Sequence, residues 1–386
     1  MLSRRIPDLR APNAWSLRLA ALRAVGGLVA DLTEANPTRT GLSPLAEAAA
    51  ALALAPTLPY EPAPLGMHSA RAAVASSLSA PGAEVQPEQI ALMPSTSDAY
   101  AHLFRLMADP GDTVLAPAPS YPLCEPIARA EGVRVRHYPL AFDGRWHLDR
   151  GALEALSPGA RALVLVEPNH PTGSYLDAED RAFAEDLAVR HDLALIVDAV
   201  FADFARDPVR PLPSWSGERR APTFVLGGLS KRCGLPHLKL GWIAVAGPEA
   251  ARREALAGLE WLADLFLGVA APVQYALPQL LALRHVFASR VAERIATNLA
   301  HVARLTAAHP ECTLLPADGG WSAVLRVPAT RTDEAWALAL LERGVAVHPG
   351  HFYDFAAGEH LVVSLIVEPA TFATGLDLID AELGAG

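Results

Sequence analysis

A serine and a lysine follow a pair of glycines at the end of an apolar run. Residues 223–226 predict a buried strand that leads into Gly227, Gly228, Leu229, Ser230 and Lys231. A second apolar run, residues 242–246, predicts another strand, so Lys231 should lie in a tight loop at a strand end. A lysine in such a cleft is costly unless it is paired or covalently used, and its amine can condense with a carbonyl to form a Schiff base. The residue alone leaves open the alternative of an exposed lysine in a turn.

A turn rich in hydroxyl groups separates another predicted strand, residues 90–93, from a helix predicted over Asp98–Met107. The turn contains Ser95, Thr96 and Ser97. Hydroxyls beside the free N–H groups of a helix start can bind an anion such as phosphate. The other interpretation is ordinary N-capping of the helix, and both can hold together.

A carboxylate, Asp198, ends the apolar run of residues 193–197. So apolar a setting calls for a cationic or N–H partner, and a pyridinium nitrogen is one such group. A loop of residues 167–173, made rigid by its prolines, presents Asn169 and His170 after a further strand. An aspartate capping the next turn, and a bare turn in the loop, are the alternatives.

Two more side chains have properties that suit a phosphorylated aromatic ligand. Tyr121 offers a flat face to a heteroaromatic ring, and Lys239 offers a positive charge to a phosphate. Half-buried packing for Tyr121 and simple solvent exposure for Lys239 are the alternative interpretations.

The elements that must position these residues alternate between strand and helix. Further strands are predicted at residues 113–116, 133–138, 162–166 and 194–197, with helices predicted at 124–130 and 177–190. Strands that are apolar on both faces, with helices between them, predict an α/β fold with a mainly parallel sheet covered by helices. In such sheets ligands bind beyond the carboxyl ends of the strands, where the polar residues named above are expected.

The pattern changes after about residue 270. A long helix is predicted over Pro278–Ala300, and shorter elements follow to the C-terminus. We therefore expect a large domain over residues 40–275 and a smaller α+β domain made of residues 1–39 and 276–386.

Composition limits the possible partners. The chain has 386 residues, a net charge of −10 and a pI of about 5.7, which argues against nucleic acid or an anionic membrane surface. The leucine-rich run of residues 17–30 is interrupted by arginines, so it predicts an amphipathic helix rather than a leader or a membrane span. The three cysteines show no metal-binding spacing, so we expect a reducing, cytoplasmic compartment and no metal site.

Taken in order along nearly the whole chain, these motifs resemble the class I and II aminotransferases, which are pyridoxal 5'-phosphate (PLP) enzymes of fold type I. The motifs are the Ser-Thr-Ser turn, the Pro-Thr-Gly loop at residues 171–173, the aspartate at 198 and the Ser-Lys loop at 230–231. The resemblance implies that Lys231 holds PLP as an internal aldimine and later moves a proton. Asp198 would pair with the pyridine nitrogen.

The resemblance also implies the remaining contacts to the cofactor. Tyr121 would stack on the ring, and the phosphate would be bound by Ser95, Thr96, Ser97, Ser230 and Lys239. Tyr60 resembles the tyrosine that reaches the phosphate of a neighbouring subunit, which implies a homodimer with shared active sites. The partners would be a small-molecule amino donor and a carbonyl acceptor.

Several positions depart from the family pattern. His170, preceded by Asn169, stands where asparagine is usual, and Phe201 stands where tyrosine is common, so both expected donors to the phenolic oxygen of PLP are altered. Lys239 replaces an arginine, which keeps the charge but loses the bidentate geometry. The late segment of residues 360–365 lacks the arginine that grips a substrate carboxylate. Other groups that remain candidates for the carboxylate are Asn36, Trp321, His348 and His351.

Three functions are compatible with these residues and departures. The first is an aminotransferase that moves an amino group between an amino acid or amine and a keto acid or ketone. The second is a PLP-dependent decarboxylase or lyase on the same fold, which the altered loop and the missing arginine keep open. The third is a non-enzymatic PLP-binding or regulatory protein, which the retained Lys231 and Asp198 argue against.

Overall fold

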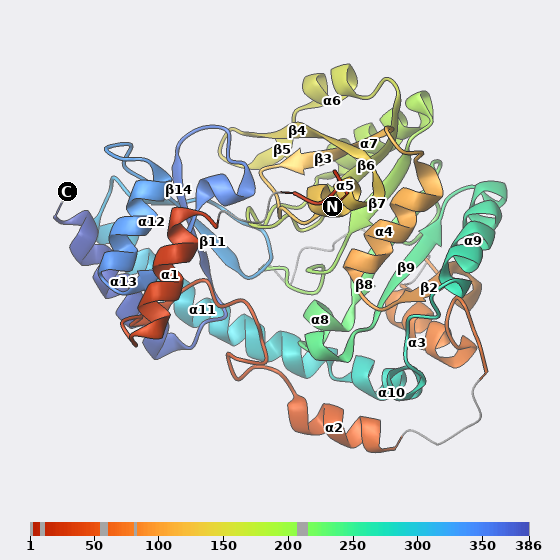
Figure 1. The fold of residues 1–386 in the computed structure, drawn as a ribbon, viewed down its shortest axis with the longest axis horizontal. Coiled ribbons are helices and arrows are strands. Elements are labelled where there is room, and N and C mark those ends of the chain that lie inside the picture. The colour runs from red at the N-terminus through yellow and green to blue at the C-terminus, as the bar shows by residue number, and fades with distance from the viewer. Residues whose placement is uncertain (1–2, 8–11, 55–60, 81–82, 207–214, 386) are drawn as a thin grey trace.

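The structure is a computed structural model, and it describes residues 3–7, 12–54, 61–80, 83–206 and 215–385. Its dominant feature is a sheet of eight strands flanked by helices, with a second group of smaller sheets and helices beside it (Figure 1). The fold class is α/β, as the alternation of apolar runs and helices predicted.

The large sheet has the strand order β2-β9-β8-β7-β6-β3-β4-β5. Its strands are β2 (Ile90–Met93), β3 (Thr113–Ala118), β4 (Arg134–Phe142), β5 (Trp146–Leu148), β6 (Ala160–Val166), β7 (Ala194–Asp198), β8 (Thr223–Gly228) and β9 (Gly241–Ala246). The pairs from β8 to β4 are parallel, whereas β9 runs antiparallel to both β8 and β2. Because β9 is antiparallel to both of its neighbours, β2 and β8 run in the same direction.

Helices cover both faces of this sheet, which explains why its strands are apolar throughout. Side chains on β6 alternate between the two faces, with Leu163 and Leu165 in one core cluster and Ala162 and Val164 in the other. The first face carries α2 (Leu45–Ala53), α3 (His68–Leu78), α6 (Arg150–Leu156), α7 (Ala178–His191) and α10 (Ala271–Ala282); the second carries α4 (Thr96–Met107), α5 (Cys124–Glu131) and α9 (Glu249–Asp264).

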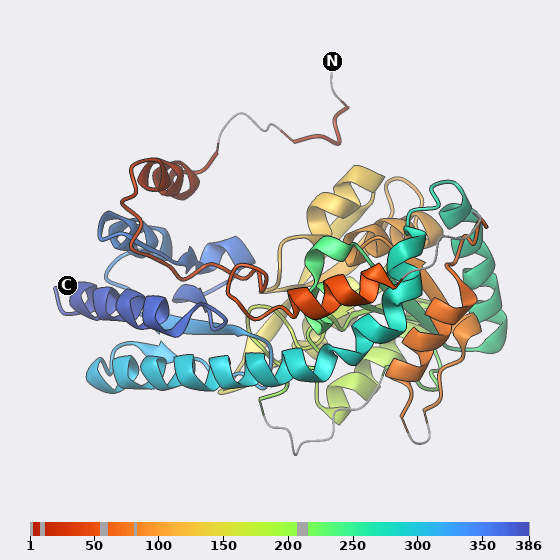
Figure 2. The ribbon, with the colours of Figure 1, turned by 90° about the horizontal axis from the view of Figure 1, so that it is seen from below.

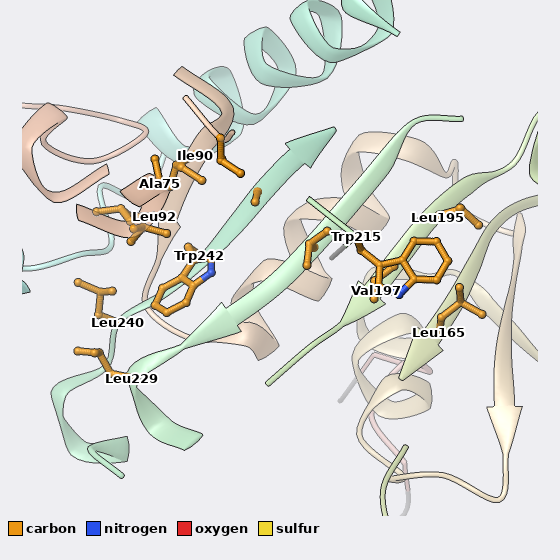
Figure 3. Packing of buried hydrophobic residues seen from close by; sticks show 14 of the residues in the cluster. Ala75, Ile90, Leu92, Leu165, Leu195, Val197, Trp215, Leu229, Leu240 and Trp242 are labelled. Carbon is orange, nitrogen blue, oxygen red and sulfur yellow. The ribbon is translucent and has the colours of Figure 1, made fainter. Parts of the chain in front are cut away.

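The core on the first face is anchored by two tryptophans. Trp242 on β9 packs among Leu92, Leu229 and Leu240, and Trp215 lies over the strands that carry Leu165, Leu195 and Val197 (Figure 3). Burying side chains of this size supplies much of the apolar area that stabilises the sheet.

The second group combines residues from both ends of the chain. A four-stranded antiparallel sheet has the order β10-β11-β14-β13, and a two-stranded parallel sheet pairs β1 with β12. The elements are α1 (Ala14–Ala24), β1 (Ala30–Asp31), α11 (Arg284–Ala308), β10 (Thr313–Leu314), β11 (Ser322–Val327), α12 (Asp333–Glu342), β12 (Val345–Ala346), β13 (His348–Pro349), β14 (Glu359–Ser364) and α13 (Pro369–Leu383).

The long helix α11 runs from this second group toward α10 beside the large sheet (Figures 1 and 2). Short 3-10 helices occur at Pro87–Gln89, Pro236–Leu238 and Gly350–Tyr353, and the short helix α8 spans Leu229–Arg232. Pairing of β1 with β12 ties the N-terminal segment to the C-terminal part of the chain, while the domain boundary at residue 275 stays a prediction.

The helix predicted over Pro278–Ala300 is wrong in its bounds. The structure has two helices there, α10 and α11, separated at Leu283, and Pro278 lies inside α10. Proline favours a first helical turn, and Pro272 occupies that position in α10, eight residues after the end of α9. Burial of Val273, Leu277 and Leu280 against the sheet offsets the cost of an internal proline.

Across the residues that the structure describes, no helix combines the length and apolarity needed to cross a membrane. The same residues hold no cluster of three or more side chains suited to bind a metal ion.

Candidate active site

The polar residues singled out in the sequence gather along one edge of the large sheet. The strands β2, β6, β7 and β8 all end at this edge, because they share one direction, and β9 begins there. Register places Asp198, the last residue of β7, beside Leu226 of β8, two residues before the glycine that precedes α8. The side chains that follow these strands are thus brought together from distant parts of the chain.

The turn after β2 has the form of an anion-binding helix start. Ser95 is the N-cap of α4, and its hydroxyl accepts a hydrogen bond from the backbone N–H of Asp98 at 3.1 Å. The same hydroxyl donates to the carboxylate of Asp98. Thr96 and Ser97 form the first turn, so the capping and the anion-binding interpretations are compatible.

Glycines allow the neighbouring strands to approach this turn. A Cβ atom on Gly241 would lie 3.2 Å from the backbone nitrogen of Thr96, and one on Gly228 would lie 3.1 Å from the Cα of Gly241. Any larger residue at these positions would push the start of α4 away from the end of β8. Gly228 and Gly241 therefore allow the Ser-Lys loop and the hydroxyl-rich turn to lie side by side.

Lys231 lies on α8 with its amine among aromatic rings. Its Nζ atom is 5.3 Å from the ring centroid of Trp321 and 5.7 Å from that of Phe201. Burial lowers the pKa of this amine, and the negative charge of Asp198 opposes that shift. A lowered amine pKa increases the neutral, nucleophilic fraction at physiological pH.

Asp198 is held by two hydrogen bonds. The phenol of Tyr100 donates to Oδ2 at 3.1 Å, and the backbone N–H of Val200 donates to Oδ1 at 3.2 Å. Burial raises the pKa of the carboxyl, while these two donors and the charge of Lys231 lower it. Tyr100 and Ser120 line, together with Asp198 and Tyr121, a cavity of about 60 Å³.

The side-chain amide of Asn169 hydrogen-bonds within its own loop and to the loop that follows β3. Its amide donates to the carbonyl of Pro119 and to the hydroxyl of Thr172, both at 2.9 Å, and its oxygen accepts from Ser120 at 3.0 Å. Both amide N–H groups are used, so Asn169 has no free donor for a ligand. Of the two adjacent residues, only His170 is therefore available for the predicted contact with a cofactor.

That next residue, His170, lies in the aromatic cluster beside Lys231. Its ring stacks on Phe201 with centroids 5.6 Å apart and makes edge contacts with Tyr121 and Tyr353. Desolvation, with a smaller effect of the Lys231 charge, lowers the pKa of His170 to about 3. The imidazole is therefore neutral at physiological pH, with Nδ1 3.4 Å from the hydroxyl of Ser322.

The remaining predicted residues differ in exposure. Tyr121 is 52% exposed and borders the small cavity beside Asp198. Lys239 is exposed, has a left-handed backbone with φ of 49°, and follows the 3-10 helix Pro236–Leu238. Ser230 lies on α8, directly before Lys231. Tyr60 lies outside the described residues.

Strand β14 carries no arginine where the family places one. Val362 packs with Leu315, Val324 and Tyr353, and His360 stacks on Phe355 at 4.5 Å. Of the four other candidates, Trp321 and His348 are linked to the aromatic cluster: Trp321 lies over Lys231, and His348 bonds the hydroxyl of Tyr353 at 2.8 Å. His351 bonds Asp333, and the side-chain oxygen of Asn36 accepts from Thr38 within its own turn.

Tyr100, Ser322 and Tyr353 were missed by sequence reasoning. Tyr100 follows Thr96 by four residues, so helical spacing alone would place it on the same face of α4 as the hydroxyl-rich turn. Ser322 and Tyr353 reach the site from the second group of elements. No local sequence pattern predicts contacts between residues so far apart in the chain.

Known proteins of one family resemble this chain in sequence. The sequence model of the family described as aminotransferase class I and II matches residues 33–369. Nicotianamine aminotransferase 1 of Oryza sativa subsp. japonica is 29% identical over 228 residues, covering 57% of this chain and 45% of the relative. Glutamate-pyruvate aminotransferase AlaA of Escherichia coli (strain K12) is 28% identical over 222 residues, covering 55% of this chain and 53% of the relative. The alignments thus span about half the length of these curated relatives.

Solved structures share the fold over the whole chain. An alanine aminotransferase from Pyrococcus furiosus superposes with a TM-score of 0.89 at 18% identity, covering 100% of both chains. An aspartate aminotransferase variant from Thermus thermophilus gives a TM-score of 0.82 at 22% identity, covering 99% of both chains. The fold is that of fold type I enzymes, and the family match extends over most of the sequence. This chain belongs to the class I and II aminotransferase family.

Proposed function

We propose that this protein is a PLP-dependent aminotransferase that moves an amino group between an amino acid or amine and a keto acid or ketone. The observation that carries the proposal is the meeting of a desolvated amine, Lys231, with a half-buried carboxylate, Asp198, at one sheet edge. A hydroxyl-rich helix start lies at the same edge. An amine, a carboxylate and an anion site are the three groups that a phosphorylated pyridine aldehyde requires.

The residues present fit such a cofactor. Ser95, Thr96 and Ser97, with Ser230 and Lys239, would bind the phosphate, and Tyr121 would lie against the ring. Asp198 would pair with the ring nitrogen. A small cavity lined by both Tyr121 and Asp198 supports these two assignments. When bound, PLP supplies a carbonyl that condenses with amines and a ring that delocalises an electron pair.

The protein's own groups would then hold the cofactor, move a proton and exclude water. Lys231 would hold the cofactor covalently and, once its amine is free, move a proton at the substrate carbon, for which a lowered amine pKa is suited. Asp198 would keep the ring nitrogen protonated. His170, neutral in its stacked position, would offer a ring nitrogen to the phenolic oxygen where asparagine is usual. The aromatic rings of Phe201 and Trp321 would exclude water from the amine.

A homodimer with shared sites is part of the proposal. A groove of about 680 Å³ lies along α4, the loop after α9 and the start of α10, and Asp98 and Glu61 are among its lining residues. Large apolar side chains that line the groove are exposed, namely Phe266 at 61% and Leu267 at 39%. A second copy seated there would cover this apolar surface and would lie beside the proposed phosphate site.

The state of the cysteines supports a cytoplasmic location. Cys124, Cys233 and Cys312 are free thiols, and burial raises the pKa of Cys233 to about 12, so it stays protonated and inert. Free, unpaired cysteines are typical of a reducing compartment.

A second candidate is a PLP-dependent decarboxylase or lyase. The apolar position of Val362 in the packed cluster on β14 favours it, since no arginine from that strand can grip a substrate carboxylate there. Loss of that contact removes a restraint on which bond at the substrate carbon breaks.

A half-reaction screen separates the two. Purified protein reconstituted with PLP is mixed with single amino acids and simple amines, and its absorbance spectrum is followed. An aminotransferase loses the spectrum of the bound aldehyde form with a donor and recovers it when a keto acid is added. Release of CO2, ammonia or thiol without that cycle would support the second candidate, and a spectrum unchanged by any amine would count against both.

A further inference from the structure

We infer that Tyr100 is a positioning residue that fixes the carboxylate of Asp198 for the ring nitrogen of the cofactor. The inference rests on the proposed function, because it assigns to Tyr100 a role only if Asp198 faces a pyridine nitrogen. Neither the sequence motifs nor the family match assigns any role to this tyrosine.

The contact is direct and buried. Tyr100 is 4% exposed, and its hydroxyl lies 3.1 Å from Oδ2 of Asp198. Within the described part of the chain, the only other hydrogen bond to this carboxylate comes from the N–H of Val200, on Oδ1. One side-chain donor and one backbone donor therefore set the plane of the carboxylate, with one donor on each oxygen.

Helix α4 links this contact to the proposed phosphate site. Thr96 and Tyr100 are four residues apart, so their side chains lie one above the other on the same face. The start of the helix presents Ser95, Thr96 and Ser97, and its second turn presents the phenol to Asp198. A single rigid element thus sets the distance between the group that holds the phosphate and the group that orients the carboxylate (Figure 1).

The electrostatic setting agrees with a donor role. Burial and the nearby charge of Asp198 raise the pKa of Tyr100 well above its ordinary value, so the phenol stays protonated. A protonated phenol donates to the carboxylate and favours its charged form, in opposition to the burial that raises the pKa of Asp198. The other titratable groups near this carboxylate are Lys231 on α8 and Cys124 on α5.

Tyr138 provides a matched control. It is also buried, at 1% exposed, and its hydroxyl donates to a backbone carbonyl, that of Val164, at 2.8 Å. Tyr100→Phe and Tyr138→Phe each remove one buried phenol hydroxyl and keep the ring. Only the first removes a hydrogen bond from Asp198.

The test measures the affinity of the full-length apo-protein for two probes by equilibrium titration. One probe is PLP, and the other is its 1-deaza analogue, in which carbon replaces the ring nitrogen. We expect Tyr100→Phe to weaken PLP binding about tenfold, the scale of a hydrogen bond to a charged group, and to leave binding of the analogue unchanged. Tyr138→Phe should alter neither affinity.

The possible outcomes separate this inference from the proposed function. If Tyr100→Phe binds PLP as tightly as the unaltered protein, or loses both probes equally, Tyr100 acts only in packing and the inference fails while the proposed function stands. If the unaltered protein binds neither probe, the proposed function fails and the inference fails with it.

Discussion

The Nζ atom of Lys231 lies 5.3 Å from the centroid of the Trp321 ring, so an amine from α8, at the end of the large sheet, meets an indole from the segment that leads into β11. The contact joins the two groups of elements at the proposed site. Phe201, on the loop after β7, packs into the same core cluster as Trp321. The environment of the amine is therefore built by both groups, and neither alone would desolvate it.

Replacing the amine should abolish covalent attachment and leave the fold intact. Lys231→Ala removes a buried amine whose charge is costly to desolvate, so we expect no loss of stability but no covalent spectrum with PLP and no turnover. Lys239→Ala is the control, since it removes an exposed charge and should retain the covalent spectrum with weaker cofactor binding. Absorbance and circular dichroism check both variants, and turnover by Lys231→Ala would exclude the proposed mechanism.

The loop of residues 170–173 should be sensitive to a single methyl group. Gly173 has φ of 70°, and a Cβ there would lie 2.7 Å from the Cβ of Ala317. We expect Gly173→Ala to lower the free energy of unfolding by about 2–4 kcal/mol, from backbone strain and overpacking together.

Substitution of Gly320 measures the backbone-strain part of that loss of unfolding free energy separately. Its φ is 69°, but a Cβ there would meet no atom within 4 Å. Gly320→Ala should therefore lower the free energy of unfolding by only about 1 kcal/mol. Chemical denaturation measures both variants, and equal losses would contradict the contact between Gly173 and the segment of residues 317–319.

Partly buried histidines should make the protein less stable in mild acid. Burial lowers the pKa of His348 to about 4, below its value of 6.5 in an unfolded chain. The unfolded state then binds more protons, so this stability is present above pH 6.5 and is lost as the pH falls toward 4. His348→Phe should reduce the loss of unfolding free energy between about pH 6.5 and about pH 5 by roughly 2 kcal/mol.

The measurement for this prediction is urea unfolding across that pH range. His170→Asn should reduce the acid loss in the same direction, because desolvation lowers the pKa of His170 to about 3. An unchanged pH dependence in both variants would show that these imidazoles bind protons equally well in the folded and the unfolded protein.

Phe201 should control the pH at which the bound cofactor changes its spectrum. The ring of Phe201 stacks on His170 and lies 5.7 Å from the amine of Lys231. In Phe201→Tyr the added hydroxyl would donate to the phenolic oxygen of the cofactor and stabilise its negative charge. We expect the midpoint of the absorbance titration to fall by about one pH unit.

Phe204→Tyr is the matched control for that titration. Phe204 is buried 6.3 Å from Phe201, centroid to centroid, and packs against Phe287 rather than Lys231. Its added hydroxyl should lower stability without moving the midpoint. A midpoint that does not move in Phe201→Tyr would place the phenolic oxygen away from this ring.

The sequence predicted the large sheet well because its strands are apolar on both faces. Runs such as residues 194–197 and 223–226 allow few other structures, and the polar residues after them had to meet at one edge. Pro278 misled the prediction of helix bounds, since tertiary burial of its neighbours decides where α10 begins.

The wall of the site contributed by the second group of elements was harder to predict. Ser322 and Tyr353 reach His170 from more than 150 residues away, and their positions follow from how β11 and β13 each pair with β14. The hydrogen bonds from Asn169 to Pro119 and Thr172 could not be predicted either, because the sequence does not show which of two adjacent polar side chains points into a loop.

The central claim is covalent attachment of the cofactor to one amine. The sequence contains two lysines, Lys231 and Lys239, so reduction of the PLP-loaded protein with borohydride, followed by mass spectrometry of its peptides, has two possible side-chain targets. We predict a stable pyridoxyl adduct on Lys231 and none on Lys239. An adduct on Lys239 alone, or an unlabelled Lys231 in fully loaded protein, would contradict the account.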